Sequence, residues 1–204
     1  MNHGIKTKKD RVHIEANPTP DRFQSLIFPS GFTKYDRYTS IYTRKEELTH
    51  FVEKNGRVAL ALLDNQVIIG FAVLDYPEET ERWARLGGKI VMALKAVEVL
   101  REERNCGIAR KLLFPLFSDV GLEEKIVYLT AYSWTWDLEY SGLSLWGYRN
   151  MLIALYSGFG FIESGTNELN ICLKPENIFM VRKGKNVVQK IQEKFKWLRF
   201  GVSI

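Results

Sequence analysis

The sequence predicts an α/β fold in a single domain, with a sheet whose first strands are antiparallel. The chain has 204 residues, a length that fits one domain. Its apolar content of 46% and charged content of 26% are those of an ordinary globular protein rather than a disordered one. Two adjacent β-rich runs in residues 57–75 predict a hairpin, and strands and helices alternate after it. Such a hairpin is not part of a purely parallel, doubly wound sheet.

The first half of the chain is expected to form two helices and then this hairpin. The break at residues 17–20 contains two prolines, and Asp21 is expected to cap a short helix over residues 21–28. Residues 29–43 carry no clear pattern. Residues 44–54 have helical spacing of apolar residues, and the hairpin strands 57–63 and 66–75 flank the turn pair Asp64-Asn65.

The second half alternates between strands and helices. The sequence predicts a long strand over residues 89–100, a loop at 101–106, a helix at 107–120, a strand at 125–132, a helix at 145–158, short strands at 161–164 and 178–181, and a terminal amphipathic helix at 186–199. Residues 78–85 are charged and are expected to be helical or looped.

Several classes of protein are excluded by what the sequence lacks. The longest apolar runs, such as residues 58–63, are far shorter than the ~18 residues of a membrane span, and residues 1–6 do not resemble a secretory signal. The two cysteines, Cys106 and Cys172, allow one bridge but no disulfide framework, and no histidine lies near them at zinc-ligand spacing. We therefore expect no metal and a reducing, cytoplasmic location.

The charge of the chain is concentrated at its ends. Of the net +5, residues 1–11 carry +3 and residues 182–199 carry +6, which leaves the body at −4. Basic ends suit an acidic protein, a phosphorylated ligand or nucleic acid, but they also serve as solvated surface. No nucleic-acid motif accompanies them, so nucleic acid is not expected as a partner. The short apolar runs likewise give no reason to expect a membrane partner.

The segment most informative about chemistry is a predicted strand, loop and helix start over residues 96–113. A helix N-terminus exposes N–H groups that bind phosphates, and Gly107 and Ala109 would let a diphosphate approach the backbone. Asn105 tolerates a left-handed conformation, and Arg104 and Arg110 add positive charge. Neither the Gly-x-Gly-x-x-Gly nor the Gly-x-x-x-x-Gly-Lys-Ser/Thr fingerprint is present.

Here the chain resembles the GCN5-related N-acetyltransferases. Arg104-x-x-Gly107-x-Ala109 is similar to that family's acyl-CoA-binding motif, and residues 154–161, Ala-Leu-Tyr-Ser-Gly-Phe-Gly-Phe, are similar to a motif at the end of its fourth helix. The resemblance implies a mostly antiparallel central sheet with a splayed strand pair, and acetyl-CoA as acyl donor. It also implies one domain over residues 1–204, with core motifs in 57–183 and residues 184–204 as a basic extension. The implied cofactor-binding residues are Val97, Val99, Arg104, Asn105, Cys106, Gly107, Ile108, Ala109 and Arg110.

A narrower resemblance is to the acetoin-utilisation branch of that family, which contains protein acetyltransferases that modify a lysine of acetyl-CoA synthetase. It is carried by short segments spread along the chain: Pro77-x-x-x-Glu81-Arg82-Trp83, Trp134-x-Trp136-Asp137-Leu138, Trp146-x-Tyr148-Arg149, Gly184-Lys185-Asn186-Val187 and Leu198-Arg199-Phe200. These matches run nearly to the C-terminus, so they imply that the terminal helix belongs to the family pattern.

Acetyl transfer to a lysine needs a base, because holding a lysine amine neutral at pH 7 costs about 4.6 kcal/mol. Glu98 is the first candidate, since it lies in the strand expected to bind the cofactor and faces away from Val97 and Val99. Asp137 and Glu81 are rivals, and Glu98 could instead be paired with a cross-strand cation or simply exposed. Tyr156 is expected to hydrogen-bond the departing thiolate, or else to pack in the core.

Trp134 and Trp136 lie two residues apart and would share one face if they belonged to the preceding strand, where with Asp137 they would line an acceptor groove. Large aromatic residues of the core would leave the same pattern. Two other functions remain open: acetylation of a small-molecule amine, and a non-catalytic acyl-CoA sensor. The acceptor, the acyl-chain preference and the oligomeric state are not specified by the sequence.

Overall fold

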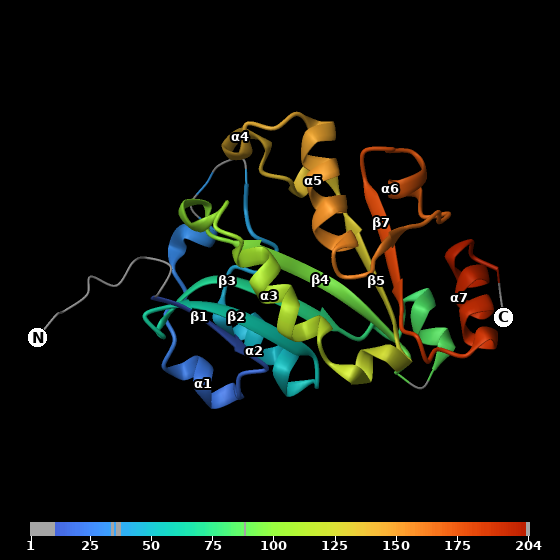
Figure 1. The fold of residues 1–204 in the computed structure, drawn as a ribbon, viewed down its shortest axis with the longest axis horizontal. Coiled ribbons are helices and arrows are strands. Elements are labelled where there is room, and N and C mark those ends of the chain that lie inside the picture. Colours follow the sequence, from blue (N-terminus) through green and yellow to red (C-terminus); the bar gives the residue numbers. More distant parts are fainter. Residues whose placement is uncertain (1–10, 34, 36–37, 88, 203–204) are drawn as a thin grey trace, which may run out of the picture. The chain divides into compact units, whose positions relative to one another are not determined.

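The computed structural model describes residues 11–33, 35, 38–87 and 89–202, and the basic N-terminal residues 1–10 lie outside this description. The chain divides into two compact units: an N-terminal unit of residues 1–73 and 96–116, and a C-terminal unit of residues 74–95 and 117–204. Seven strands follow the order β1-β2-β3-β4-β5-β7-β6, and β3 (Val67–Asp75) and β4 (Val91–Val99) contribute residues to both units (Figure 1). The mixed sheet, mostly antiparallel with one parallel pair, confirms the expected fold class.

The N-terminal unit begins with a strand that sequence reasoning missed. Strand β1 (Val12–Ala16) pairs antiparallel with β2 (Arg57–Leu63), in a register that places Val12 opposite Leu63. The alternation of apolar and polar residues along β1 is a usable signal. The predicted hairpin is confirmed: both turn residues between β2 and β3 have positive φ, 49° at Asp64 and 62° at Asn65, as a tight hairpin turn requires.

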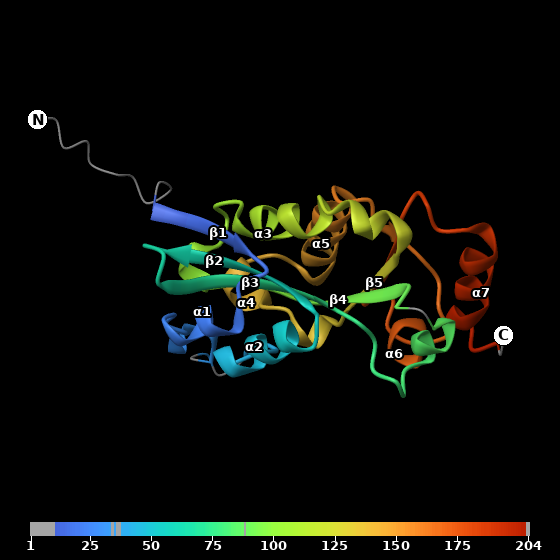
Figure 2. The ribbon, with the colours of Figure 1, turned by 90° about the horizontal axis from the view of Figure 1, so that it is seen from below.

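Helices cover both faces of the strands in this unit. Figure 2 shows α1 (Pro20–Gln24) and α2 (Lys45–Glu53) on one side of β1–β3 and α3 (Ile108–Phe117) on the other. Phe23 of α1 and Leu48 of α2 pack with buried residues of β2 and β3 in one apolar cluster. Burial of these faces, rather than helix propensity, stabilises such short helices.

Helix α1 differs from the sequence expectation at both ends. It begins at Pro20, whose fixed φ suits the first helical position, so Asp21 lies within the first turn and does not cap the helix. It ends at Gln24 rather than residue 28, because Ile27 forms a bridge with Val67.

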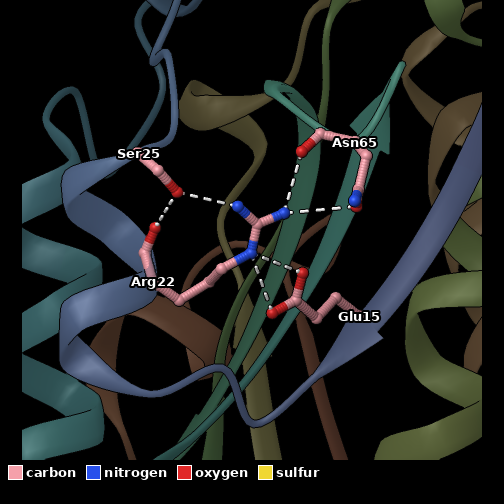
Figure 3. A network of polar contacts seen from close by, with 4 residues as sticks. All are labelled: Glu15, Arg22, Ser25 and Asn65. Carbon is pink, nitrogen blue, oxygen red and sulfur yellow. Dashed lines mark hydrogen bonds and ion pairs between the residues drawn. The ribbon is translucent and has the colours of Figure 1, made fainter.

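A polar network fixes α1 to the strands of the N-terminal unit. Figure 3 shows the Arg22 guanidinium donating to the Glu15 carboxylate of β1, to Ser25 Oγ and to Asn65 in the hairpin turn. The guanidinium thus joins a strand, a helix end and a turn. Lysine could not replace it, because a single ammonium does not present donors in several fixed directions of one plane.

In the C-terminal unit, β7 (Ile178–Lys183) is flanked by β5 (Ile126–Ala131) and by the two-residue β6 (Ile162–Glu163), both antiparallel to it. The parallel register of β4 with β5 spans only Val91–Ala93 opposite Ile126–Tyr128. This short register agrees with a strand pair that splays. The unit also contains helices α4 (Leu138–Ser141), α5 (Leu145–Ser157), α6 (Leu169–Cys172) and α7 (Gln189–Arg199). No helix within the described residues is both long and apolar enough to cross a membrane.

The terminal helix α7 packs onto its own unit, beside the short 3₁₀ turn Arg82–Leu86, which is green in Figure 1. Trp83 of this turn stacks on Phe195 and Phe179, with ring centroids 5.0 and 5.7 Å apart. Helix α7 begins at Gln189 instead of the expected residue 186, because the preceding residues form a turn against the main chain of Glu123. A Cβ on Gly184 would collide with that main chain.

Candidate cofactor loop and catalytic residues

The segment expected to bind the cofactor forms the predicted strand, loop and helix start within the N-terminal unit. After β4 the chain makes one 3₁₀ turn, Arg101–Glu103, and reverses through two residues with positive φ, 62° at Asn105 and 76° at Gly107. Helix α3 then begins at Ile108, and the Lys111 N–H donates to the Gly107 carbonyl. Asn105 thus adopts the left-handed conformation that its residue type tolerates.

The exposed part of this loop is the part that a diphosphate would approach. Asn105, Cys106, Gly107 and Arg110 are exposed, whereas Ile108 is buried and anchors the start of the helix. A Cβ on Gly107 would meet nothing within 4 Å, so glycine serves the positive φ here and also keeps the approach open. A turn of this kind before a ten-residue helix suits an anion.

A glycine that sequence reasoning did not single out places α3 on the sheet. A Cβ on Gly70 of β3 would lie 2.9 Å from the Glu98 carbonyl oxygen, 3.3 Å from Leu112 and 3.4 Å from Ile108. Gly70 therefore allows the first turns of α3 to lie close to β3 and β4. A lone glycine inside a predicted strand is the sequence signal for such a close approach.

Arg104, the first residue of the acyl-CoA motif, is partly engaged with the protein itself. Its Nε donates to the carbonyl oxygen of Val99 at 3.0 Å, which ties the loop to the end of β4. Val99 is buried and Val97 is partly buried. The motif thus shapes its own loop as well as adding charge to it.

Glu98 is buried, which excludes the expectation that it is simply exposed. The residue is 8% exposed, and its carboxylate accepts a hydrogen bond from the hydroxyl of Tyr38. Tyr38 belongs to residues 29–43, which carry no sequence signal, so this contact could not be anticipated. A buried carboxylate held by a phenol, in the strand that leads into the cofactor loop, has surroundings suited to a general base.

Tyr156 lies in the C-terminal unit, where it is the buried residue of α5. Its ring meets Phe161 edge-on with centroids 6.1 Å apart, and the Phe161 N–H donates to its carbonyl oxygen. Gly160, with φ 82°, turns the chain so that Phe161 is buried in this way. The second family motif, residues 154–161, therefore forms a helix end that is stabilised by the contact between the Tyr156 and Phe161 rings. The expected role of the Tyr156 hydroxyl at the thiolate stays a prediction.

Trp134 and Trp136 do not belong to the preceding strand, so the condition under which they would share one face is not met. Strand β5 ends at Ala131 and a 3₁₀ turn follows, so Trp134 is 54% exposed and stacks on Tyr132, whereas Trp136 is 8% exposed and stacks on Tyr148. Among the described residues, the buried Trp136 indole nitrogen has no hydrogen-bond partner.

Asp137, the third residue expected at the acceptor, is buried at the start of α4. Its carboxylate accepts from the Tyr140 N–H and so caps that helix. Helix capping is therefore one role that the structure shows for this carboxylate. A role for Trp134, Trp136 and Asp137 at the acceptor stays a prediction.

Glu81, the other rival base, is held in a polar cluster of the C-terminal unit. It accepts from the Tyr128 hydroxyl at 2.7 Å, and Lys95 Nζ lies 3.6 Å from its carboxylate. Burial, reinforced by Glu81, raises the pKa of Tyr128 far above its usual value. Burial and a bond to Glu168 raise the pKa of Tyr132 to about 12. Both hydroxyls therefore keep their protons and act as donors, and Glu81 serves as an acceptor in this cluster.

The remaining expectations concern thiols and metals. Cys106 and Cys172 are both free and exposed, so the single bridge that the sequence allowed is not formed. Within the described part of the chain, no group of acidic, histidine or cysteine side chains gathers as a metal site would require.

Known proteins resemble this chain over most of its length. A family model described as "Acetyltransferase (GNAT) family" matches residues 21–134. The acetoin utilization protein AcuA of Bacillus subtilis is 30% identical over 196 residues, which cover 96% of this chain and 92% of that protein. The AcuA of Bacillus licheniformis is 29% identical with the same coverage.

Solved structures agree with the sequence relatives. The crystal structure of an acetoin utilization protein from Exiguobacterium sibiricum superposes with a TM-score of 0.82 and 29% identity, covering 93% of this chain and 89% of that one. A GNAT-family acetyltransferase from Streptococcus pneumoniae, with a TM-score of 0.53 and 16% identity over 84% of this chain and 98% of that one, shares the fold.

Proposed function

This chain belongs to the acetyltransferase (GNAT) family, and from that premise we propose that the amine it acetylates is a lysine side chain of acetyl-CoA synthetase. The protein is an acetyl-CoA-dependent N-acetyltransferase, with acetyl-CoA as its acyl donor. The resemblances found in the sequence, to the broad family and to its acetoin-utilisation branch, are confirmed. We further propose that Glu98 and Tyr156 act in the transfer to this acceptor and that the protein is cytoplasmic.

One observation carries the proposal: the similarity to acetoin utilization proteins extends over 96% of the chain and so includes the C-terminal element. One segment of the narrower resemblance, Glu81-Arg82-Trp83, contacts the terminal helix α7, whose end carries another, Leu198-Arg199-Phe200. Trp83 stacks on Phe195 of α7, and Arg82 donates to the carbonyl oxygens of Leu198 and Arg199. Two segments of the branch thus pack together, which supports a function shared with the branch beyond the common fold.

The proposed chemistry begins at the cofactor loop. The N–H groups at the start of α3 bind the diphosphate of acetyl-CoA, and Arg110 adds charge at an exposed position. Glu98 accepts a proton from the acceptor ammonium, directly or through water, so that the lysine, whose neutral form costs ~4.6 kcal/mol at pH 7, can act as a nucleophile.

The neutral amine then attacks the thioester carbonyl and a C–N bond forms. As the tetrahedral intermediate collapses, the C–S bond breaks, the carbonyl re-forms, and the nitrogen loses its second proton to water to give the neutral amide. The electron pair leaves with sulfur as the CoA thiolate, and the hydroxyl of Tyr156 stabilises it by hydrogen bonding. Full proton transfer from a tyrosine, with a pKa of ~10, to a thiolate, whose thiol has a pKa of ~8.5, is uphill. Stabilisation of the thiolate is therefore the role that we assign.

The acceptor is tested by incubating the protein with labelled acetyl-CoA and purified acetyl-CoA synthetase, with a cell lysate and a panel of polyamines in parallel. We expect label on a synthetase lysine, located by mass spectrometry. Label on the polyamines alone would establish the small-amine alternative. Label on lysate proteins but not on the synthetase would show that the acceptor is a protein lysine, but that the protein is not acetyl-CoA synthetase.

The base is tested by comparing Glu98→Gln with the matched control Glu102→Gln, a change of the same kind at an exposed glutamate of the next turn. Glu98→Gln should lower kcat by about 10²–10⁴-fold and leave acetyl-CoA binding intact, because the change is isosteric. The defect should shrink at high pH, where each unit supplies about ten times more neutral lysine. Parallel pH–rate profiles of wild type and variant would exclude Glu98 and favour Asp137 or Glu81.

A further inference from the structure

The segment before α2 reaches the buried carboxylate of β4. The hydroxyl of Tyr38 donates to the carboxylate of Glu98, although the two residues lie 60 positions apart in the chain. Both residues belong to the N-terminal unit, as does the cofactor loop. The contact therefore joins a region without any sequence motif to the candidate base.

Two arginines that follow β4 hold the ring of Tyr38. The guanidinium carbon of Arg104 lies 5.0 Å from the ring centroid, and that of Arg101 lies 5.7 Å from it. The Arg104 Nε also donates to the Val99 carbonyl, which fixes the position of its guanidinium on the end of β4. Cations over an aromatic face are attracted to it, so these contacts restrict the ring as well as the hydroxyl.

The main chain of Glu98 is closely packed as well. On the β3 side, the Cβ position of Gly70 is only 2.9 Å from the Glu98 carbonyl oxygen, and Ile108 and Leu112 of α3 approach the same point. A buried carboxylate must be hydrogen-bonded to remain charged, and a base must be aimed within tight limits to accept a proton efficiently. The phenol of Tyr38 meets both needs.

We propose that Tyr38 is a positioning residue for the acetyl-transfer reaction: its hydroxyl orients the Glu98 carboxylate, and Arg101 and Arg104 hold its ring. This inference rests on the proposed role of Glu98 as base. Tyr38 does not itself take the proton; it fixes the group that does. Since Arg104 belongs to the cofactor loop and contacts this ring, one side chain links the two parts of the site in the N-terminal unit.

A neighbouring tyrosine provides a matched control. Tyr35 comes from the same segment and its ring also receives Arg101, with the guanidinium carbon 3.6 Å from the centroid. Its hydroxyl, however, donates to Glu102 at 2.7 Å. Tyr35→Phe and Tyr38→Phe therefore remove the same atom from the same segment. The first change takes a donor from an exposed glutamate of the loop, and the second takes a donor from the candidate base.

The test compares the two variants in initial rates of acetylation, with labelled acetyl-CoA and acetyl-CoA synthetase, and with lysate proteins as a second acceptor. Tyr38→Phe should lower kcat about tenfold and leave the KM for acetyl-CoA within about twofold, a share of the 10²–10⁴-fold that a general base contributes. The acidic limb of its pH–rate profile should move to higher pH, because the charged form of the base has lost a donor. Tyr35→Phe should behave as wild type.

A double-mutant cycle separates the failure of this inference from the failure of the proposed base. In a Glu98→Gln background, Tyr38→Phe should have no further effect on the rate, since nothing remains to be positioned. If Glu98→Gln retains full activity, the assignment of the base fails. If Glu98→Gln is impaired while Tyr38→Phe is not, or if the two defects multiply, the positioning role of Tyr38 is wrong and the base stands. Unfolding temperatures of all variants identify any loss that is merely structural.

Discussion

Replacing Gly70 by alanine tests whether the close approach of α3 to β3 places the cofactor loop. The added Cβ would lie 2.9 Å from a main-chain oxygen, where van der Waals contact begins at about 3.4 Å, so strand or helix must move by about half an ångström. Overpacking costs about 1–3 kcal/mol, and a main-chain obstacle places the cost near the upper value. Loss of glycine's freedom in the unfolded chain offsets about 0.4–1 kcal/mol. The net destabilisation is about 2 kcal/mol by this reckoning.

For a chain of this length, that value lowers the unfolding temperature by about 4–8 °C, which scanning calorimetry resolves. Titration calorimetry with acetyl-CoA should show weaker binding as well, because α3 carries the loop. Gly165→Ala is the matched control, since its Cβ would meet Phe200 at an ordinary 3.7 Å. If the Gly70→Ala protein has the unfolding temperature of wild type and the same affinity for acetyl-CoA, this glycine is not what allows α3 to pack close to the sheet.

The remaining predictions concern the cofactor, the thiolate and the dependence of stability on pH. Gly107→Glu adds bulk and negative charge at the open side of the loop and should abolish acetyl-CoA binding; unchanged affinity by calorimetry would place the site elsewhere. Tyr156→Phe should keep the fold, because the ring remains, and should lower kcat by about 10²-fold, the loss typical of one hydrogen-bond donor to a developing anion, whereas a loss below about threefold would mean that this residue serves only in packing. Tyr132, with its pKa raised to about 12 by burial and Glu168, contributes stability that is complete below pH ~10 and is lost as pH rises toward 12. Urea midpoints should fall over that range, and less so in Tyr132→Phe; an equal fall in both proteins would contradict the assignment.

Much of the local structure can be predicted from short stretches of the sequence. The hairpin follows from two β-rich runs around Asp64-Asn65, and the reversal into α3 follows from Asn105 and Gly107, because these residue types tolerate positive φ. Helix boundaries are less predictable. Asp21 lies inside α1 rather than before it. Helix α7 begins at Gln189 rather than residue 186, because the preceding residues form a turn against the main chain of Glu123.

The candidate site divides in the same way. The acyl-CoA motif is contiguous, so its loop can be found by inspection and the family follows from it. The tyrosine that donates to Glu98 cannot be found in this way, since Tyr38 lies in a segment without periodicity and contacts Glu98 only in the folded chain. Whether Trp134 and Trp136 share one face depends on whether β5 continues, which the sequence leaves open, and the strand ends at Ala131.

The family, the order of most elements and the loop that precedes α3 can be predicted from the amino-acid sequence, because they depend on residue types at short, fixed spacing. Which groups meet depends on the folded chain: Tyr38 contacts Glu98, Gly70 lies beneath α3, and Trp83 packs against α7. Such pairings join residues far apart in the chain, and they are selected by the packing of whole elements, where every buried volume and polar group must be matched at once.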